Sequence, residues 1–167
     1  LSRGLGDVYK RLQKGLIPVN ASVRRFRDLI LYNLEAGEAV LTDNNDVRIY
    51  TDGKEKFRAL IKEMQQARKY IHLQYYIIRN DELWQEIEAV LIQKAREGVQ
   101  VRVLFDSMGC RTMHNKDWER LEKEGIQVAE FFPALLGQLQ LRVNYRNHRK
   151  IVVIDGRIGF VGGFNCL

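Results

Sequence analysis

Cysteine is scarce in this sequence, which holds only Cys110 and Cys166 among its 167 residues. The two form no Cys-x-x-Cys pair and no spacing typical of a metal site, so a disulfide framework is not expected. Such sparse use of cysteine fits a reducing compartment. The sequence also lacks a Walker-type phosphate loop, a Ser-His-Asp pattern typical of hydrolases and any internal repeat. Phosphate-loop and serine-hydrolase functions are therefore not indicated.

Long apolar runs are missing too. No stretch of about 18 apolar residues occurs, so the sequence contains no candidate transmembrane helix. Acidic residues are in the minority, with 21 Asp and Glu against 27 Lys and Arg, a net charge of +6 and a pI of about 9.4. This balance favours a polyanionic partner, either acidic phospholipid or nucleic acid, although a basic surface without a partner has the same composition. The length allows one domain with a sizeable core.

Basic residues are concentrated in the first 35 positions. Apolar residues recur at helical spacing from Val23 to Tyr32 and predict a helix over about residues 21–34. A basic amphipathic helix can lie on an anionic membrane, or it can dock on the rest of the protein with its basic face in water. We therefore expect a basic helical segment at 1–35, followed by a separate domain at 36–167.

Residues 36–167 alternate between strand-like and helix-like patterns. Strands are predicted at 47–50, 70–78, 99–105 and 126–131, and helices at 54–69, 81–98 and 115–125. This alternation predicts an α/β fold with a mixed sheet sandwiched between helices. The run 70–78 is almost continuously apolar, as is typical of a strand buried on both faces.

Two side chains near predicted strand ends are candidates for bordering a site. Tyr76 lies near the end of the 70–78 strand, and Asp106 directly follows the 99–105 strand. Ligands of open α/β sheets gather beyond the carboxyl ends of the strands. Asp106 is thus expected to border a pocket, to orient a histidine, or simply to cap its own loop. His72, inside the strand, is more typical of a hydrogen-bonded core residue than of a catalytic one.

The C-terminal stretch 147–165 has the strongest local pattern. Residues 149–154 are β-branched and apolar enough for a buried strand. Asp155-Gly156 is a hairpin-turn signal, and residues 157–161 would run back beside the first strand. The sequence therefore predicts a β-hairpin here.

Chemically active groups flank this hairpin. His148 and Lys150 point the same way because side chains alternate along a strand. Gly162 and Gly163 allow unusual backbone angles and a close approach to a ligand, and Asn165 adds an amide donor. An imidazole can attack phosphorus and carry the phosphoryl group, while lysine and amide groups stabilise charge on phosphate oxygens. A lone His-x-Lys would equally suit the polar edge of a hairpin, so the complete spacing decides.

That spacing resembles the signature of the phospholipase D superfamily. His-x-Lys, four residues, Asp, six residues and Gly-Gly-x-Asn fall on His148, Lys150, Asp155, Gly162, Gly163 and Asn165. The run 144–156 and the strand 70–78 are similar to bacterial cardiolipin synthases of the phospholipase D type. The resemblance covers about residues 36–165.

The resemblance implies a phosphatidyltransferase. His148 would attack phosphatidylglycerol and form a phosphatidyl-histidine, which a second phosphatidylglycerol would displace to give cardiolipin and glycerol. Lys150 and Asn165 would bind the phosphate together with the two motif glycines, and Asp155 would fix the local structure of the motif or orient a histidine. No cofactor and no metal are implied, because lysines supply the positive charge.

The family builds one active site from two such motifs, whereas this sequence carries one. It therefore resembles the first half of a synthase, completed by a second half of the parent chain or by a second copy. The resemblance also implies a bacterial cell membrane location, through membrane-spanning segments ahead of this region, and contact with anionic phospholipid.

Three other functions remain open at this point: a phospholipase D, a nuclease acting as a homodimer, or a non-catalytic half-site. The apolar stretch 131–141 is expected to touch either acyl chains or the second half. Together with the synthase-like residues around His148, it argues against nucleic acid as the partner.

Overall fold

The computed structural model of the protein describes residues 21–37, 39, 41–42, 45–131 and 146–167. The chain divides into two units, Leu1–Ile49 and Tyr50–Leu167. The boundary expected after residue 35 falls inside the first unit. The apolar stretch 131–141 lies, apart from Phe131, outside the described residues.

In the first unit, the described helices are α2 (Ala21–Arg24) and α3 (Arg27–Gly37). A turn at Arg25 and Phe26 separates them, so the helix predicted over residues 21–34 is present in two pieces. Leu34 is buried, Val23, Ile30 and Leu31 are half-buried, and Phe26, Leu29 and Tyr32 are exposed.

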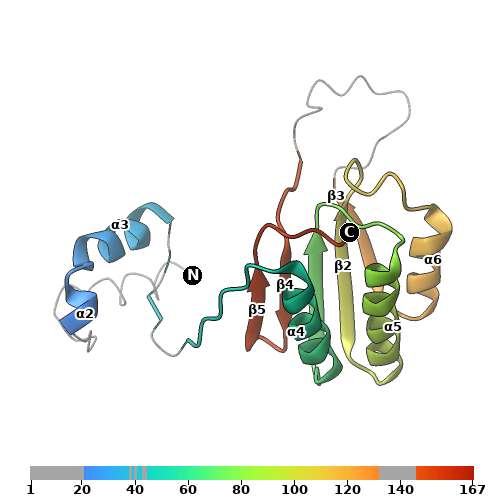
Figure 1. The fold of residues 1–167 in the computed structure, drawn as a ribbon, viewed down its shortest axis with the longest axis horizontal. Helices are drawn as coiled ribbons and strands as arrows, with labels where there is room; N and C mark the ends of the chain where they lie inside the picture. The colour runs from blue at the N-terminus through green and yellow to red at the C-terminus, as the bar shows by residue number, and fades with distance from the viewer. Residues whose placement is uncertain (1–20, 38, 40, 43–44, 132–145) are drawn as a thin grey trace. The chain divides into compact units, whose positions relative to one another are not determined.

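The second unit is built on a five-stranded mixed sheet (Figure 1). Its strands are β1 (Tyr70–Tyr75), β2 (Gln100–Asp106), β3 (Gln127–Phe131), β4 (Ile151–Ile154) and β5 (Ile158–Val161). The order is β3-β2-β1-β4-β5, in which β1, β2 and β3 are parallel and β4 is antiparallel to both of its neighbours. The predicted α/β class, the mixed sheet and the C-terminal hairpin are confirmed.

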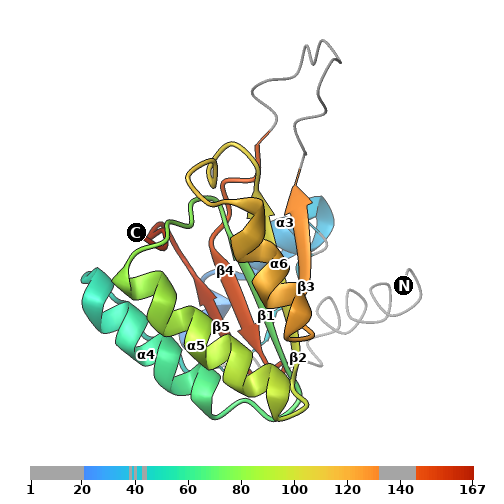
Figure 2. The ribbon, with the colours of Figure 1, turned by 90° about the vertical axis from the view of Figure 1, so that its right-hand side faces the viewer.

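Three helices cover one face of this sheet: α4 (Gly53–Gln65), α5 (Glu82–Arg96) and α6 (Asn115–Lys123). Figure 2 shows all three on the same side of the strands. The side chains of Asp52 and Asp81 accept hydrogen bonds from the first turns of α4 and α5, which is a typical helix start. Alternate residues of the strands pack against the helices and form a single apolar core with them.

The opposite face of the sheet differs from the expectation. On β1, Ile71 and Leu73 are buried against the helices, whereas His72 and Gln74 on the other face are only half-buried, and Arg102 beside them on β2 is exposed. Within the described residues of the second unit, no helix covers this face. The 70–78 run is therefore fully buried on one face only, because the alternate positions of β1 carry polar side chains that are half-buried.

One predicted strand is wrong. Residues 47–50 form no strand, and both Val47 and Ile49 are largely exposed. Their alternating pattern lacks a partner strand among the described residues, and an isolated extended segment is not stable in water.

None of the helices in the described parts of the chain is long and apolar enough to cross a bilayer.

Candidate active site

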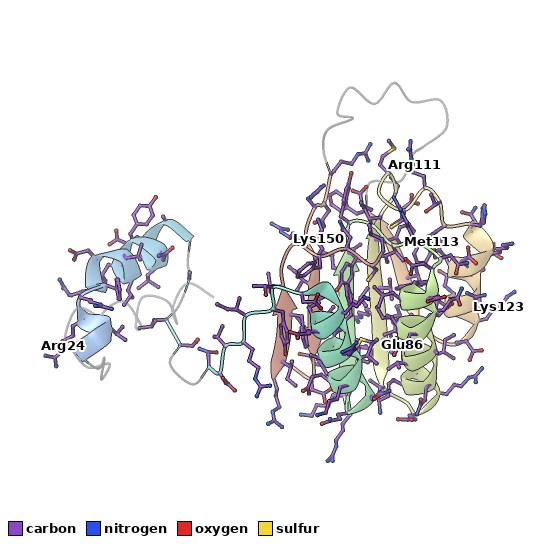
Figure 3. The ribbon with its side chains drawn as sticks, in the orientation of Figure 1. Arg24, Glu86, Arg111, Met113, Lys123 and Lys150 are labelled. Atoms are coloured by element: carbon purple, nitrogen blue, oxygen red, sulfur yellow. The ribbon has the colours of Figure 1, made fainter. Side chains whose placement is uncertain are left out.

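The motif residues are divided between the two ends of β4. His148 and Lys150 precede the strand, and Asp155 follows it. Because β4 runs antiparallel to β1, its start lies beside the end of β1. Figure 3 shows Lys150 toward this edge of the sheet, where β1 and β2 also end. A strand of four residues separates the two groups by about 13 Å.

His148 and Lys150 contact each other directly, although both precede β4. Lys150 Nζ lies 3.0 Å from His148 Nδ1 and donates to the His148 carbonyl oxygen at 2.7 Å. Lys150 is buried and His148 is exposed. Burial lowers the pKa of the Lys150 ammonium, and no carboxylate among the described residues forms an ion pair with it. The pair therefore presents an unneutralised cation next to an accessible imidazole.

The second ring nitrogen of His148 is unoccupied. Among the described residues, Nε2 has no hydrogen-bond partner, whereas Nδ1 faces Lys150. The ring is also covered on one face by Tyr76, with the two ring centroids 3.9 Å apart and the planes inclined by 33°. The Tyr76 ring lies 5.3 Å from Lys150 Nζ as well. Tyr76 is thus placed next to both motif residues.

Asp106 connects the loop after β2 to the segment that carries the histidine. Its carboxylate is buried, and Oδ1 accepts from the backbone N–H groups of Met108 and Gly109 at 3.0 and 3.1 Å. Oδ2 accepts from the backbone N–H of Asn147 at 3.0 Å. Asp106 therefore caps its own loop and also holds the residue before His148, without a hydrogen bond to the imidazole itself.

Gly162 lies beside Lys150, since its backbone N–H donates to the Lys150 carbonyl oxygen at 3.2 Å. The unusual backbone angles expected at Gly162 and Gly163 are not found, because neither residue has a positive φ. A Cβ added at either glycine would meet no atom within 4 Å. Among the described residues the two glycines thus border open space, which a ligand or a partner can occupy.

Asn165 is fixed through its amide oxygen. Asn165 Oδ1 accepts from the backbone N–H of Ile77 at 3.2 Å, just after Tyr76. Because a backbone N–H can only donate, the side-chain atom of Asn165 that faces Ile77 must be the oxygen. The side-chain NH₂ of Asn165 does not take part in this hydrogen bond. In the described residues this NH₂ has no acceptor, and it is available to an anionic ligand.

Asp155 accepts hydrogen bonds from the backbone at the other end of β4. Its two oxygens accept from the backbone N–H groups of Arg68, Lys69 and Tyr70 at 2.8 to 2.9 Å. Burial alone would raise the pKa of this carboxyl, but the three N–H donors and the charge of Lys69 outweigh it and lower the pKa. Of the two roles left open for Asp155, these contacts match the fixing of local structure, and none of them reaches His148.

Gly109 is a site residue that the sequence did not reveal. A Cβ at this position would lie 1.9 Å from the backbone oxygen of Tyr76, so only glycine permits this approach. The thiol of Cys110 donates to the same oxygen at 3.5 Å. The only sequence signal was a glycine three residues after Asp106, at the end of a strand.

The described residues contain no group of three or more His, Cys, Asp or Glu side chains that could hold a metal ion.

Known proteins of one family are similar to this chain in sequence. The family described as "Cardiolipin synthase, PLD-like domain" matches residues 60–166. The major cardiolipin synthase ClsA of Bacillus subtilis is 50% identical over 139 residues, which cover 83% of this chain and 29% of that protein. A cardiolipin synthase of Staphylococcus aureus is 49% identical over 146 residues, covering 87% of this chain and 30% of that protein.

A fold comparison places NucT from Helicobacter pylori at a TM-score of 0.49 and 19% identity, over 68% of this chain and 69% of that one. The site and the sequence matches together define a phospholipase D-like domain. The chain belongs to the family of cardiolipin synthase phospholipase D-like domains. It spans less than a third of the length of the curated relatives it matches.

Proposed function

We propose that this chain supplies one half of the active site of a phosphatidyltransferase that makes cardiolipin and glycerol from two molecules of phosphatidylglycerol. The observation that carries the proposal is the exposed His148 with a free Nε2, next to a buried Lys150 that has no counter-ion among the described residues. A nucleophile beside an unneutralised cation suits attack on an anionic phosphodiester. The relatives named as cardiolipin synthases indicate which phosphodiester.

In the first step, a lone pair of His148 Nε2 attacks the phosphorus of one phosphatidylglycerol. A P–N bond forms, the P–O bond to the headgroup glycerol breaks, and glycerol leaves with a proton from a histidine of a second motif. In the second step, a hydroxyl of another phosphatidylglycerol attacks the phosphorus and returns its proton to that second histidine. The P–N bond breaks, cardiolipin leaves, and His148 is restored.

Lys150 has two positions in this scheme. While its ammonium donates to His148 Nδ1, as it does here, the imidazole proton must sit on Nε2, which then has no lone pair for attack. A phosphate anion competes for the ammonium more strongly than a neutral nitrogen does. Substrate binding therefore draws Lys150 away from Nδ1, lets the imidazole proton move there, and exposes the Nε2 lone pair.

Phosphate oxygens would be held by groups from three segments: Lys150, the NH₂ of Asn165, and the backbone at Gly162 and Gly163, where side-chain space is empty. Tyr76 would border the pocket through its ring, and Asp106 through the segment that it holds. Asp155 would keep the far end of β4 in register. These roles need no cofactor and no metal.

The acceptor alcohol must be favoured over water, and His148 is exposed in this chain. Transfer to a lipid hydroxyl requires that water be excluded when the phosphatidyl-histidine forms. We therefore propose that a second motif, from the parent chain or from a second copy, covers this edge of the sheet. The net charge of +6 favours the anionic surface of a bacterial membrane as the place of reaction.

Lipid turnover tests the proposal. The full-length protein is incubated with phosphatidylglycerol in detergent micelles, beside a His148→Ala variant, and the products are identified by mass spectrometry. Cardiolipin and glycerol in equal amounts, both absent with the variant, are expected. Phosphatidic acid in place of cardiolipin would mean that water is the acceptor and the enzyme is a phospholipase. No lipid product from folded protein, with cleavage of DNA, would replace the proposal by a nuclease.

A further inference from the structure

We propose that Tyr76 is a positioning residue, whose ring holds the His148 imidazole in line for attack at the moment when Lys150 leaves it for the phosphate. The catalytic consequence rests on the proposed function. The contact between the two rings does not, and it can be tested separately.

Among the described residues, the imidazole ring of His148 makes one polar contact and one contact with another ring. Lys150 lies 3.0 Å from Nδ1, and Tyr76 lies on one face, at 3.9 Å between centroids. An exposed histidine is otherwise free to rotate about its side-chain bonds. Once Lys150 turns to the phosphate, the Tyr76 ring is the remaining contact that restricts this rotation. A nucleophile displaced by about 1 Å can lose on the order of a hundredfold in rate.

Tyr76 can act as a fixed support because its own backbone is held. Its carbonyl oxygen lies so close to Gly109 that no side chain fits between them, and it accepts from the Cys110 thiol. Asp106 Oδ1 binds the backbone of Gly109, while Asp106 Oδ2 binds the backbone of Asn147. One buried carboxylate thus sets the spacing between the loop that supports Tyr76 and the segment that carries His148.

The ring of Tyr76 matters here, and not its hydroxyl. Within the described part of the chain the hydroxyl makes no hydrogen bond, whereas the ring faces both His148 and Lys150. Phenylalanine at position 76 should therefore position His148 as tyrosine does, whereas leucine, which has no ring, should not. The chain also offers a matched control: Tyr70, at the start of β1, stacks on His72 with centroids 4.5 Å apart, whereas Tyr76 directly follows the end of that strand.

The kinetic test compares Tyr76→Leu, Tyr76→Phe and Tyr70→Leu in the full-length protein with phosphatidylglycerol as substrate. Tyr76→Leu should lower kcat by about 10- to 100-fold with little change in KM, because the ring acts on alignment and not on substrate affinity. Tyr76→Phe and Tyr70→Leu should retain wild-type kcat. Equal losses in Tyr76→Leu and Tyr76→Phe, or a loss expressed in KM alone, would overturn the proposal.

A spectroscopic test avoids turnover altogether. In the NMR spectrum of this chain, nuclear Overhauser contacts should link the ring protons of Tyr76 and His148. The His148 ring protons should be shifted upfield in the wild type and in Tyr76→Phe, and should lose this shift in Tyr76→Leu but not in Tyr70→Leu. If the nuclear Overhauser contacts were absent in the wild-type protein, the positioning role would be refuted. This measurement requires no variant. The presence of these contacts in a protein without lipid turnover would refute only the proposed function.

Discussion

The two ends of β4 carry residues of the same motif in opposite environments. At the start of the strand, His148 is exposed, one of its ring nitrogens is unpartnered, and the neighbouring Lys150 has no acidic partner among the described residues. At the end of the strand, Asp155 has three backbone N–H donors and lies in a tight turn. The polar groups at the start of β4 are available to a ligand, whereas the carboxylate at its end is hydrogen-bonded to the backbone.

This difference separates chemistry from architecture within a short motif. A polar group that already has its full set of hydrogen bonds stabilises the fold but has little left for a ligand. A group that is held in place with bonding capacity to spare can bind or react. By this criterion, we propose that His148, Lys150 and Asn165 take part in the reaction and that Asp155 stabilises the fold. Each prediction below tests that division.

Replacing His148 with Ala should have the largest effect. Turnover of phosphatidylglycerol should fall by about a thousandfold or more because the attacking atom is removed. The free energy of unfolding should change by less than about 0.5 kcal/mol, since the side chain is exposed. Product analysis and urea unfolding measure the two quantities. Retained turnover would remove His148 from the mechanism.

Replacing Asp155 with Ala should give the opposite result. Three backbone N–H groups lose their acceptor, and alanine is strained at the φ of 54° found there, so unfolding should become easier by about 2–4 kcal/mol. The folded fraction should keep turnover within several-fold of the wild type. Urea unfolding gives the first number, and kinetics at low temperature give the second.

Asp155→Asn is the matched control. Its side-chain oxygen can keep the two bonds now made by Oδ1, to Lys69 and Tyr70, and asparagine tolerates a positive φ. It should therefore lose roughly half as much stability as the alanine variant. Loss of turnover in well-folded Asp155→Asn would place the carboxylate in the reaction and break the comparison.

Lys150→Ala should reduce kcat/KM by about a hundredfold, as is typical when one group that stabilises transition-state charge is lost. Because removal of a buried cation without a counter-ion costs little stability, the melting temperature should hardly fall. Steady-state kinetics and thermal unfolding check both statements. Substitution of Lys94, a buried lysine that forms an ion pair with Glu97, serves as the control. An unchanged catalytic efficiency would contradict the phosphate-binding role.

The smallest effect concerns pH. The pKa of Asp155 is lowered in the folded protein, so the unfolded state binds more protons and stability rises with pH across this range. Its contribution should be complete above about pH 4, the ordinary value for aspartate, and should disappear as the pH falls through the lowered pKa. Acid unfolding followed by circular dichroism should show a shallower pH dependence in Asp155→Asn. Identical profiles would mean that this carboxylate is not held as described.

The sequence predicted what depends on neighbours along the chain. The hairpin followed from Asp155-Gly156, because that pair adopts the positive φ angles of a tight turn. Strand alternation predicted that His148 and Lys150 point the same way, but it did not predict their direct contact ahead of β4. Contacts between distant segments were not predictable in this way. Tyr76 lies on His148, and Gly109 lies under Tyr76, only because β1, β2 and β4 end at the same edge.

The open face of the sheet shows the same limit. The apolar run 70–78 suggested a strand buried on both sides, but His72 and Gln74 lie on the second face and are only half-buried. Pattern alone therefore overestimated the burial of β1. At residues 47–50 the alternation was present, but no strand to pair with lies among the described residues, and no strand formed.

The most direct test of the central claim is to trap the intermediate. The full-length protein is mixed with phosphatidylglycerol, denatured within the first turnover under alkaline conditions that preserve a P–N bond, digested and examined by mass spectrometry. The account predicts a phosphatidyl group on His148, absent from His148→Ala and still present in Asp155→Asn. Turnover to cardiolipin with His148 unmodified, and the phosphatidyl group on another residue, would contradict it.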